Sequence, residues 1–325
     1  MGAILSRWCM IKTITEGKKP FGVYKIPPAP NFRLSEWFIE WGLFLSAMLS
    51  ICVTIAIAYI VFSGSIKFFS DPEVSIGYFF SGSEWTAGFE GAKYSILPLL
   101  TGTLMVAVIA ALFALPIGLI TAIYLSEYAS PLVRQIIKPT LELLAGIPTV
   151  VYGYFAVYAI TPMLSVVIPG LDPVHNQISG GLVVAIMILP MIASLSEDAM
   201  RQVPRSLREG SYALGATKFE TSTKVVVPAA LSGILASFLL AISRAVGETM
   251  AVTLACGGQP KLSLDPREGI ATMTGFIARI AQGDVPHGTT LFNSLFAVAA
   301  VLFVMTLGMN LLAQWILKKY RQVYQ

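Results

Sequence analysis

The sequence predicts an all-α, polytopic membrane protein with six transmembrane helices, and three observations carry this prediction. Of the 325 residues, 55% are hydrophobic and only 12% are charged, about half the charge of a soluble domain. Apolar runs of about 20 residues, the length that crosses a hydrocarbon core of about 30 Å, recur along the chain. Lysine and arginine gather in alternate connecting segments. This composition excludes a disordered chain, a disulfide-stapled secreted module and most cytosolic enzymes.

The apolar runs place the six spans in order along the chain. They cover residues 42–62, 97–125, 143–168, 180–195, 225–255 and 291–317. The first run begins too late for a cleavable signal peptide, so we expect none. The domain boundaries follow: an N-terminal segment 1–41, the first span 42–62, a periplasmic loop 63–96, a core 97–317 and a tail 318–325.

The distribution of basic residues predicts the orientation. With the N-terminus inside, 16 of the 22 lysines and arginines fall in inside segments and five in outside loops, as the positive-inside rule requires. Both termini are therefore predicted to be cytoplasmic. Trp37, Trp41 and Trp315 suit the aromatic belt of the inner face. In the outside loop 257–290, the stretch 270–282 has helical periodicity and predicts an external helix against the membrane domain.

Proline and glycine interrupt several spans. Pro116 with Gly118, Gly146 with Pro148, and Pro190 lie inside or beside apolar runs. Such breaks are tolerated in helix bundles because neighbouring helices satisfy the freed backbone groups. Two interpretations remain open: ordinary kinks, or kinks that open a central cavity.

The chain lacks the residues that chemistry of its own would need. Its three cysteines are far apart and its two histidines too few for a metal cluster, so neither a disulfide framework nor a metal site is expected. No P-loop or catalytic triad pattern is evident. We therefore expect no bound cofactor and no enzymatic activity. Energy for active transport would have to come from another subunit.

The inside segment 196–228 is the most informative part of the sequence. One interpretation is a basic loop whose Arg201, Arg205 and Arg208 merely obey the positive-inside rule. The other is a rigid helix–glycine–helix projection that docks a partner. In that interpretation Gly215 ends the first helix with a positive φ angle, and a capping box from Thr217 to Glu220 opens the second.

A spacing pattern in this segment resembles the permease subunits of ABC importers. Their pattern is E-A-A, three residues, Gly, nine residues and I-x-L-P. This chain has Glu209, Gly210 and Ser211, then Gly215, then Val-Val-Val before Pro228, at the same spacing. Pro228 lies near the start of span five, where its missing N–H is not needed. The resemblance implies that Glu209 to Pro228 form the coupling loop that docks on an ATPase subunit.

Further motifs narrow the resemblance to the membrane subunits of phosphate importers. They are YLSEYA at 124–129, LELLAGIP at 141–148, VYG at 151–153 and RAVGETMAV at 244–252. The G-E-T-M-A-V stretch and the S-x-S-E-W element ending at Trp85 are more similar to the C-type than to the second type of subunit. The resemblance covers the chain from about Trp85 to its end.

This family implies much about fold and partners. It implies the type I ABC importer permease fold, with residues 97–317 as permease core. It implies a multi-pass protein of the bacterial cytoplasmic (inner) membrane that forms half of a phosphate path. The implied partners are a homologous second permease, two ATP-binding subunits that hydrolyse the ATP, and a periplasmic phosphate-binding protein, with no role for nucleic acid.

Arg244 and Glu248 are the outstanding charges within a predicted span. At i,i+4 they would share one helix face, and a lone charge at mid-membrane costs at least about 2.5–3.5 kcal/mol. They form either an internal ion pair that fixes packing or a station for an anion. The Thr249 hydroxyl either lines the path or bonds back to the Ala245 carbonyl. A second i,i+4 pair, Lys138 with Glu142, is predicted to be structural.

An anion station built from these residues would suit phosphate. Arginine stays charged and offers a planar fork to two oxygens. Phosphate at neutral pH keeps an O–H that the Glu248 carboxylate can accept, whereas sulfate has none and would meet only repulsion. The glutamate also prevents the arginine from holding the anion too tightly for conduction.

Three other functions stay open on the sequence. The chain could be a permease for another oxyanion, such as sulfate or molybdate. It could be a self-contained secondary transporter or channel, or a membrane-bound regulator without a path. Competition by sulfate tests the first function, and transport by the chain alone tests the second. An unchanged flux after loss of the charged pair would indicate the third.

Overall fold

The computed structural model describes residues 34–88 and 91–320, and within these ranges every regular element is a helix. Most of the predicted N-terminal segment and the last five residues of the tail lie outside the described residues. The chain divides into two compact units, residues 1–57 and 58–325. The described part of the first unit belongs to one helix, α2 (Leu34–Phe69), which continues into the second unit.

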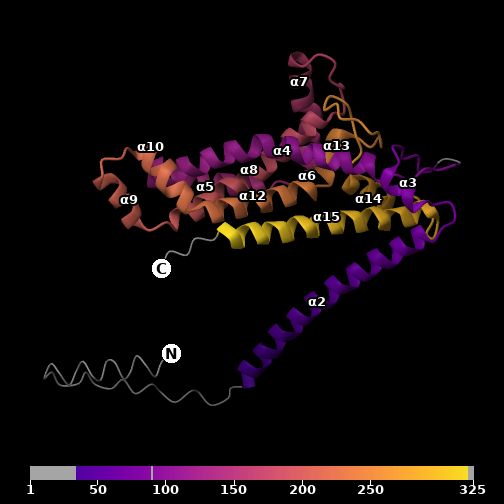
Figure 1. The fold of residues 1–325 in the computed structure, drawn as a ribbon, viewed down its shortest axis with the longest axis horizontal. Coiled ribbons are helices and arrows are strands. Elements are labelled where there is room, and N and C mark those ends of the chain that lie inside the picture. The colour runs from indigo at the N-terminus through magenta and orange to yellow at the C-terminus, as the bar shows by residue number, and fades with distance from the viewer. Residues whose placement is uncertain (1–33, 89–90, 321–325) are drawn as a thin grey trace. The chain divides into compact units, whose positions relative to one another are not determined.

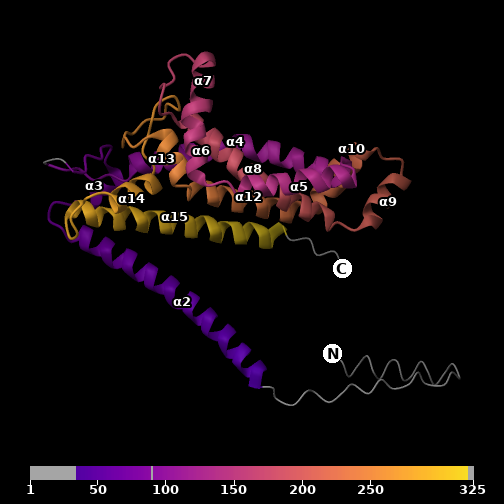
Figure 2. The ribbon, with the colours of Figure 1, turned by 180° about the vertical axis from the view of Figure 1, so that it is seen from behind.

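The second unit is a bundle of long helices with shorter helices at both ends. Its main members are α4 (Leu97–Ile123), α8 (Gln177–Arg201), α12 (Leu231–Val246) and α15 (Thr290–Tyr320). These four lie side by side in Figures 1 and 2, with α9 (Arg205–Ala213) and α10 (Lys218–Thr221) at one end of the bundle. We call this the α9 end.

The opposite end carries the remaining short helices. They are α3 (Ile76–Ser81), α6 (Thr149–Phe155), α7 (Thr161–Val167), α13 (Met250–Cys256) and α14 (Met273–Gln282). The helix predicted over residues 270–282 is present as α14, which begins at Met273, and its external position stays a prediction. Its Phe276 and Ile280 are buried against a cluster that includes Phe68, Phe79 and Trp85. Thr272 caps this helix by accepting the Gly275 N–H.

Five helices of the described chain are long and apolar enough to cross a membrane, and a bent pair makes a sixth. The bent pair joins residues 218–229 to α12 at an angle of 71°. Six spans are therefore present if this pair is one broken span. The predicted third span is corrected: helix α5 (Pro131–Ala145) ends before Pro148, and the span runs from Thr149 to Val167. A proline disfavours helical conformation in the residue before it, so Pro148 separates α5 from the span.

The core of the bundle depends on close contact between α4 and α8. A Cβ atom on Gly118 of α4 would lie 2.6 Å from Ile192 Cγ2, and one on Gly181 of α8 would lie 2.4 Å from Ile109 Cγ2. Small residues at such positions let helix backbones approach closely, which is the usual driving contact in membranes. Neither Pro116 nor Pro190 ends its helix. Gly118 is therefore a packing residue, and α4 and α8 pass through their prolines unbroken.

Three π-helical turns interrupt the α-helical hydrogen-bond pattern. They are η1 (Tyr124–Tyr128) after α4, η2 (Ala156–Ile160) between α6 and α7, and η3 (Ser222–Val226) before α11 (Val227–Ala229). Two of them, η1 and η3, flank the α9–α10 segment. Each adds a residue to its turn and so turns the following side chains relative to the helix before it.

Candidate functional site

The predicted fifth span, residues 225–255, is interrupted a second time, between Val246 and Met250, at the residues predicted to form the substrate path. We call this second interruption the break. Helix α12 ends at Val246, Gly247 caps it, and α13 begins at Met250. Arg244 and Glu248 therefore do not share one helix face, and no ion pair joins them. Of the two interpretations left open by the sequence, the internal ion pair is not formed, because the helix that would have aligned the two side chains ends between them.

Glu248 is held by the break itself. Its carboxylate Oε1 accepts the Ala251 N–H at 3.3 Å, at the positive end of α13. Its backbone carbonyl accepts the Thr274 hydroxyl of α14 at 2.7 Å. The second carboxylate oxygen makes no hydrogen bond to the residues that the structure describes. One carboxylate oxygen of the half-buried Glu248 is thus bonded, and the other can accept a hydrogen bond from a ligand.

Arg244 is exposed and forms no hydrogen bond or ion pair with any described residue. Its charge lies close enough to Tyr152 of α6 for a Coulombic interaction. The Thr249 hydroxyl bonds neither toward Ala245 nor into a helix: it donates to the Gly247 carbonyl at 3.3 Å, within the break. The break therefore presents an exposed guanidinium and, four residues further along the chain, an acid with one oxygen that bonds no described residue.

The predicted coupling loop forms two short helices joined at Gly215. The φ angle of Gly215 is +85°, and its N–H donates to the Tyr212 carbonyl at 2.9 Å while Ala216 N–H donates to the Ser211 carbonyl. This pair of bonds is the Schellman motif of a helix end. The capping box of Thr217 and Glu220 is confirmed at the start of α10.

The remaining motif residues lie on the same projection. Glu209 and Gly210 are exposed on α9, and the Ser211 hydroxyl bonds that of Thr221 at 2.9 Å, which ties α9 to α10. Pro228 lies in the first turn of α11, just before the bend into α12. The tip carries apolar side chains in solvent, with Leu214 91% and Phe219 67% exposed. Two large apolar side chains on a rigid tip are typical of a docking surface.

Arg208 joins this projection to the bundle. Its guanidinium donates to Glu127 Oε1 at 3.1 Å and to the carbonyls of Met200 and Val203 at 2.8 and 2.5 Å. Both charged side chains are mostly buried, and charge-assisted bonds of this kind are the strong ones. Arg208 thereby links α9 to η1 and to the end of α8.

A buried acid on α8 was not expected from the sequence. Glu197 is fully buried and lies 2.8 Å from Arg134 Nε, a charge contact without hydrogen-bond geometry, and 2.9 Å from Lys138 Nζ. Arg201 approaches the same carboxylate at 3.8 Å. The i,i+4 spacing of Glu197 and Arg201 was a visible signal. The cluster fixes α5 against α8.

The predicted pair of Lys138 with Glu142 is wrong. Lys138 instead donates to Glu197 and, at 2.6 Å, to Asp198. Burial by itself would lower the pKa of Lys138, but the hydrogen bonds to Asp198 and Glu197 outweigh it and raise that pKa above its ordinary value. Lys138 is therefore a charged link between α5 and α8.

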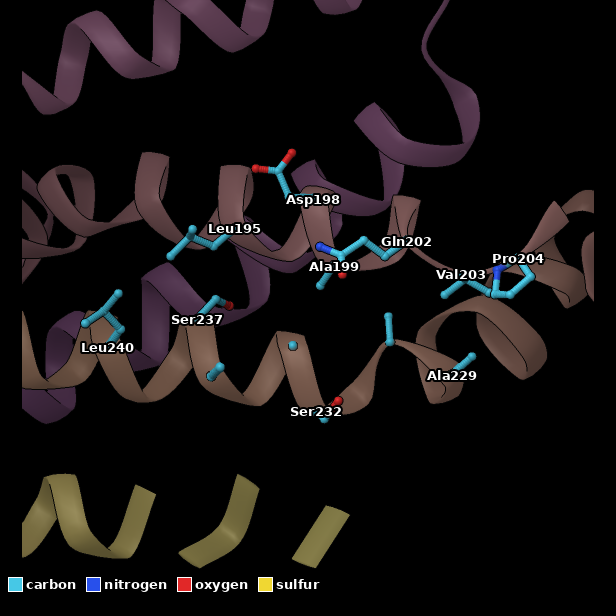
Figure 3. A pocket seen from close by; sticks show the side chains of 13 residues that line it. Leu195, Asp198, Ala199, Gln202, Val203, Pro204, Ala229, Ser232, Ser237 and Leu240 are labelled. Atoms are coloured by element: carbon cyan, nitrogen blue, oxygen red, sulfur yellow. The ribbon is translucent and has the colours of Figure 1, made fainter. Parts of the chain in front are cut away.

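A cavity of about 490 Å³ lies where α8 meets the bend into α12. Figure 3 shows its walls, which α8, the segment 202–204 and α11–α12 provide. The lining is small and apolar apart from Gln202, two serines and Asp198. The ionisable side chain in that lining is an acid, so this cavity does not suit an anion.

Comparisons with known proteins identify the family of the chain. Residues 114–322 match the family described as binding-protein-dependent transport system inner membrane component. The chain is 34% identical to the probable ABC transporter permease protein YqgH of Bacillus subtilis, over 88% of this chain and 92% of that protein. It is 32% identical to the phosphate transport system permease protein PstC of Mesorhizobium japonicum, over 89% and 92% of the two chains.

Solved structures share the fold at lower identity. A crystal structure of a bacterial ABC transporter for the acidic polysaccharide alginate aligns with a TM-score of 0.63 at 16% identity, over 89% of this chain and 99% of that one. The MetNI methionine ABC transporter in an inward-facing form aligns with a TM-score of 0.52 at 17% identity, over 70% and 94%. These likenesses concern the arrangement of helices alone.

Proposed function

The chain belongs to the family of binding-protein-dependent transport system inner membrane components, and from this premise we propose that it is the permease subunit of an ATP-driven importer of inorganic phosphate. The observation that carries the proposal is Arg244, an exposed guanidinium just before the break after Val246, with no hydrogen bond or ion pair to any described residue. Relatives named as phosphate permeases that are similar over most of the chain support the choice of substrate.

Arg244 and Glu248 divide the work of recognising phosphate. Arg244 supplies a permanent charge and a fork that fits two phosphate oxygens. The open oxygen of Glu248 accepts the phosphate O–H, a bond that fully ionised sulfate cannot make. The Glu248 carboxylate bonds the Ala251 N–H in place of Arg244, and Thr274 bonds only the backbone carbonyl of Glu248. The two groups therefore act on the substrate separately, which the sequence-based ion pair would have prevented.

The α9–Gly215–α10 projection couples this path to ATP hydrolysis in another subunit. Its apolar tip enters a groove of an ATP-binding subunit, and Arg208 transmits the movement to η1 and α8. This chain binds no nucleotide and carries out no covalent chemistry. A second permease supplies the other half of the path, two ATP-binding subunits supply the energy, and a periplasmic binding protein delivers phosphate. The assembly lies in the bacterial cytoplasmic (inner) membrane.

Phosphate uptake by cells with the rest of the importer intact tests the proposal. We expect Arg244→Gln to lower uptake at least about tenfold, because a hydrogen bond to a charged group contributes about 1.5–3 kcal/mol. We expect Glu248→Gln to make uptake sensitive to excess sulfate, which leaves the wild type unaffected. Lys67→Gln and Glu73→Gln, at exposed positions away from the break, are matched controls.

Normal uptake by correctly assembled Arg244→Gln would contradict the transport role of the break. Inhibition of the wild type by sulfate or molybdate would point to a permease for another oxyanion. Phosphate flux through this chain alone in proteoliposomes, driven by an ion gradient, would identify a secondary transporter instead.

A further inference from the structure

Four arginines line a pocket at the α9 end of the bundle. The pocket has a volume of about 430 Å³ and lies among η1, α5, the end of α8 and the start of α9. Its lining is Leu125, Ser126, Glu127, Ala129, Pro131, Arg134, Arg201, Arg205 and Arg208. It is separate from the break at Gly247 and from the cavity of Figure 3, with which it shares no lining residue.

The acids of the neighbourhood do not balance these charges. Glu127 is occupied by Arg208, and Glu197, outside the lining, is shared by Arg134 and Lys138 and lies 3.8 Å from Arg201. Arg205 forms no hydrogen bond or ion pair with any described residue. Even with Glu127 and Glu197 both counted against the four arginines, the pocket retains two positive charges.

Helix ends make the imbalance larger. Helices α5 and α9 both begin at the pocket, the first at Pro131 and the second at Arg205, and neither has an acid in its first turn. The N-terminus of a helix carries partial positive charge and disfavours cations. Arg205 nevertheless occupies the first position of α9. An anion between the two helix starts would remove this repulsion.

We propose that the pocket binds a phosphate group, from either free inorganic phosphate or an anionic lipid headgroup. Guanidinium forks pair with phosphate oxygens two at a time, and free N–H groups at helix starts add further donors. The arginines come from α5, α8 and α9, so the bound group bridges all three. Occupancy thereby holds the start of α9 against the bundle, in addition to the bond from Arg208 to Glu127.

The test uses the complete importer in lipid nanodiscs, and hydrogen–deuterium exchange in residues 129–138 and 201–212 is the readout. One arm adds inorganic phosphate to discs of zwitterionic phosphatidylcholine. The other arm replaces part of that lipid by anionic phosphatidylglycerol without free phosphate. We expect at least one arm to slow exchange in both segments, and the arm that does so identifies the source.

The Arg201→Gln/Arg205→Gln variant is expected to lose this protection: the anion concentration that gives half of the maximal protection should rise at least about tenfold. Arg205 makes no hydrogen bond or ion pair with any described residue, and Arg201 makes only the 3.8 Å contact with Glu197. Each single variant serves if the double variant assembles poorly. Lys224→Gln/Lys318→Gln, which removes two charges outside the pocket, is expected to keep the protection. Arg244→Gln should also keep it, which separates the pocket from the transport path.

Three results would overturn the proposal. One is that neither anion slows exchange in the wild type. Another is that chloride at equal ionic strength slows it equally, since the arginines would then only attract a diffuse ion atmosphere. The third is that the double arginine variant responds like the wild type.

Discussion

Glu197 is the one carboxylate that is fully buried among the residues that the structure describes. Burial of a charge is costly unless partners of opposite sign surround it. Arg134, Lys138 and Arg201 provide those partners from α5 and from the last turn of α8. Glu197 is thus a central link, together with Asp198, between the bundle and α5, which forms one wall of the four-arginine pocket.

Removal of this charge should destabilise the protein. We expect Glu197→Gln to lower the apparent free energy of unfolding in detergent by about 3 kcal/mol, the lower end for a broken buried pair, because the cations keep some access to water. Asp198→Asn is the matched control. Asp198 is 48% exposed, so its loss should change the free energy by about 1 kcal/mol or less. Equal effects of the two substitutions would show that burial does not set the cost.

At the scale of the helices, two glycines are needed for different reasons, one for its backbone conformation and one for packing. Gly215 has a positive φ, and nothing lies within 4 Å of a Cβ built there, so only backbone conformation restricts the position. Gly118 has ordinary helical backbone, and only the neighbouring Ile192 restricts it. The two positions therefore respond to different substitutions.

At Gly215 the substitution should act through the backbone. We expect Gly215→Val to reduce substrate-stimulated ATPase activity of the assembled importer, because a β-branched residue in the left-handed region costs about 1–2 kcal/mol and distorts the helix end. Gly215→Asn, of similar size, should keep most coupling, since asparagine adopts this conformation readily. Full coupling in the valine variant would mean that the shape of the tip is not needed.

At Gly118 the substitution should act through packing. We expect Gly118→Ala to lower the free energy of unfolding by about 1–3 kcal/mol, as overpacking does. In the background of Ile192→Ala this cost should shrink, because the clashing methyl group is gone. Gly308→Ala, with nothing within 4 Å of its Cβ, is the control and should be neutral or stabilising. An undiminished cost in the Ile192→Ala background would place the strain elsewhere.

For the whole molecule, the bent pair of residues 218–229 and α12 decides the topology. If the pair crosses the membrane once, the described chain has six spans and both ends of the protein face the same side. If it does not cross, five spans place the ends on opposite sides. The positive-inside distribution of lysine and arginine predicts the first arrangement, with both ends cytoplasmic.

Reporter fusions at each terminus measure this directly. We expect a reporter that is active only in the cytoplasm to work at the N-terminus and at the C-terminus alike. A third fusion, in the outside loop after Gly283, should be inactive and serves as the control for export. An inactive C-terminal fusion would show that the bent pair re-enters the membrane on one side without crossing.

The sequence by itself determined the features that rest on local chemistry. Apolar run length gave the spans, because crossing hydrocarbon needs about 20 residues whatever surrounds them. Gly215 and the box of Thr217 and Glu220 located the helix ends of the coupling segment, because caps depend on residues a few positions apart. The helix ends of the coupling segment are at the expected positions, and the spans are present except that the third begins at Thr149 and the helix of the fifth ends at Val246.

The tertiary structure alone decided which charges meet. Helix periodicity paired Arg244 with Glu248 and Lys138 with Glu142. In the structure the helix ends between Arg244 and Glu248, whose carbonyl bonds Thr274, and Lys138 bonds Glu197, 59 residues away. Packing between remote segments likewise brings Arg208 to Glu127 and gathers the four arginines of the pocket. A buried charge takes whichever partner the fold brings within a few ångströms, and that distance is set by packing between remote segments, which spacing along one helix does not contain.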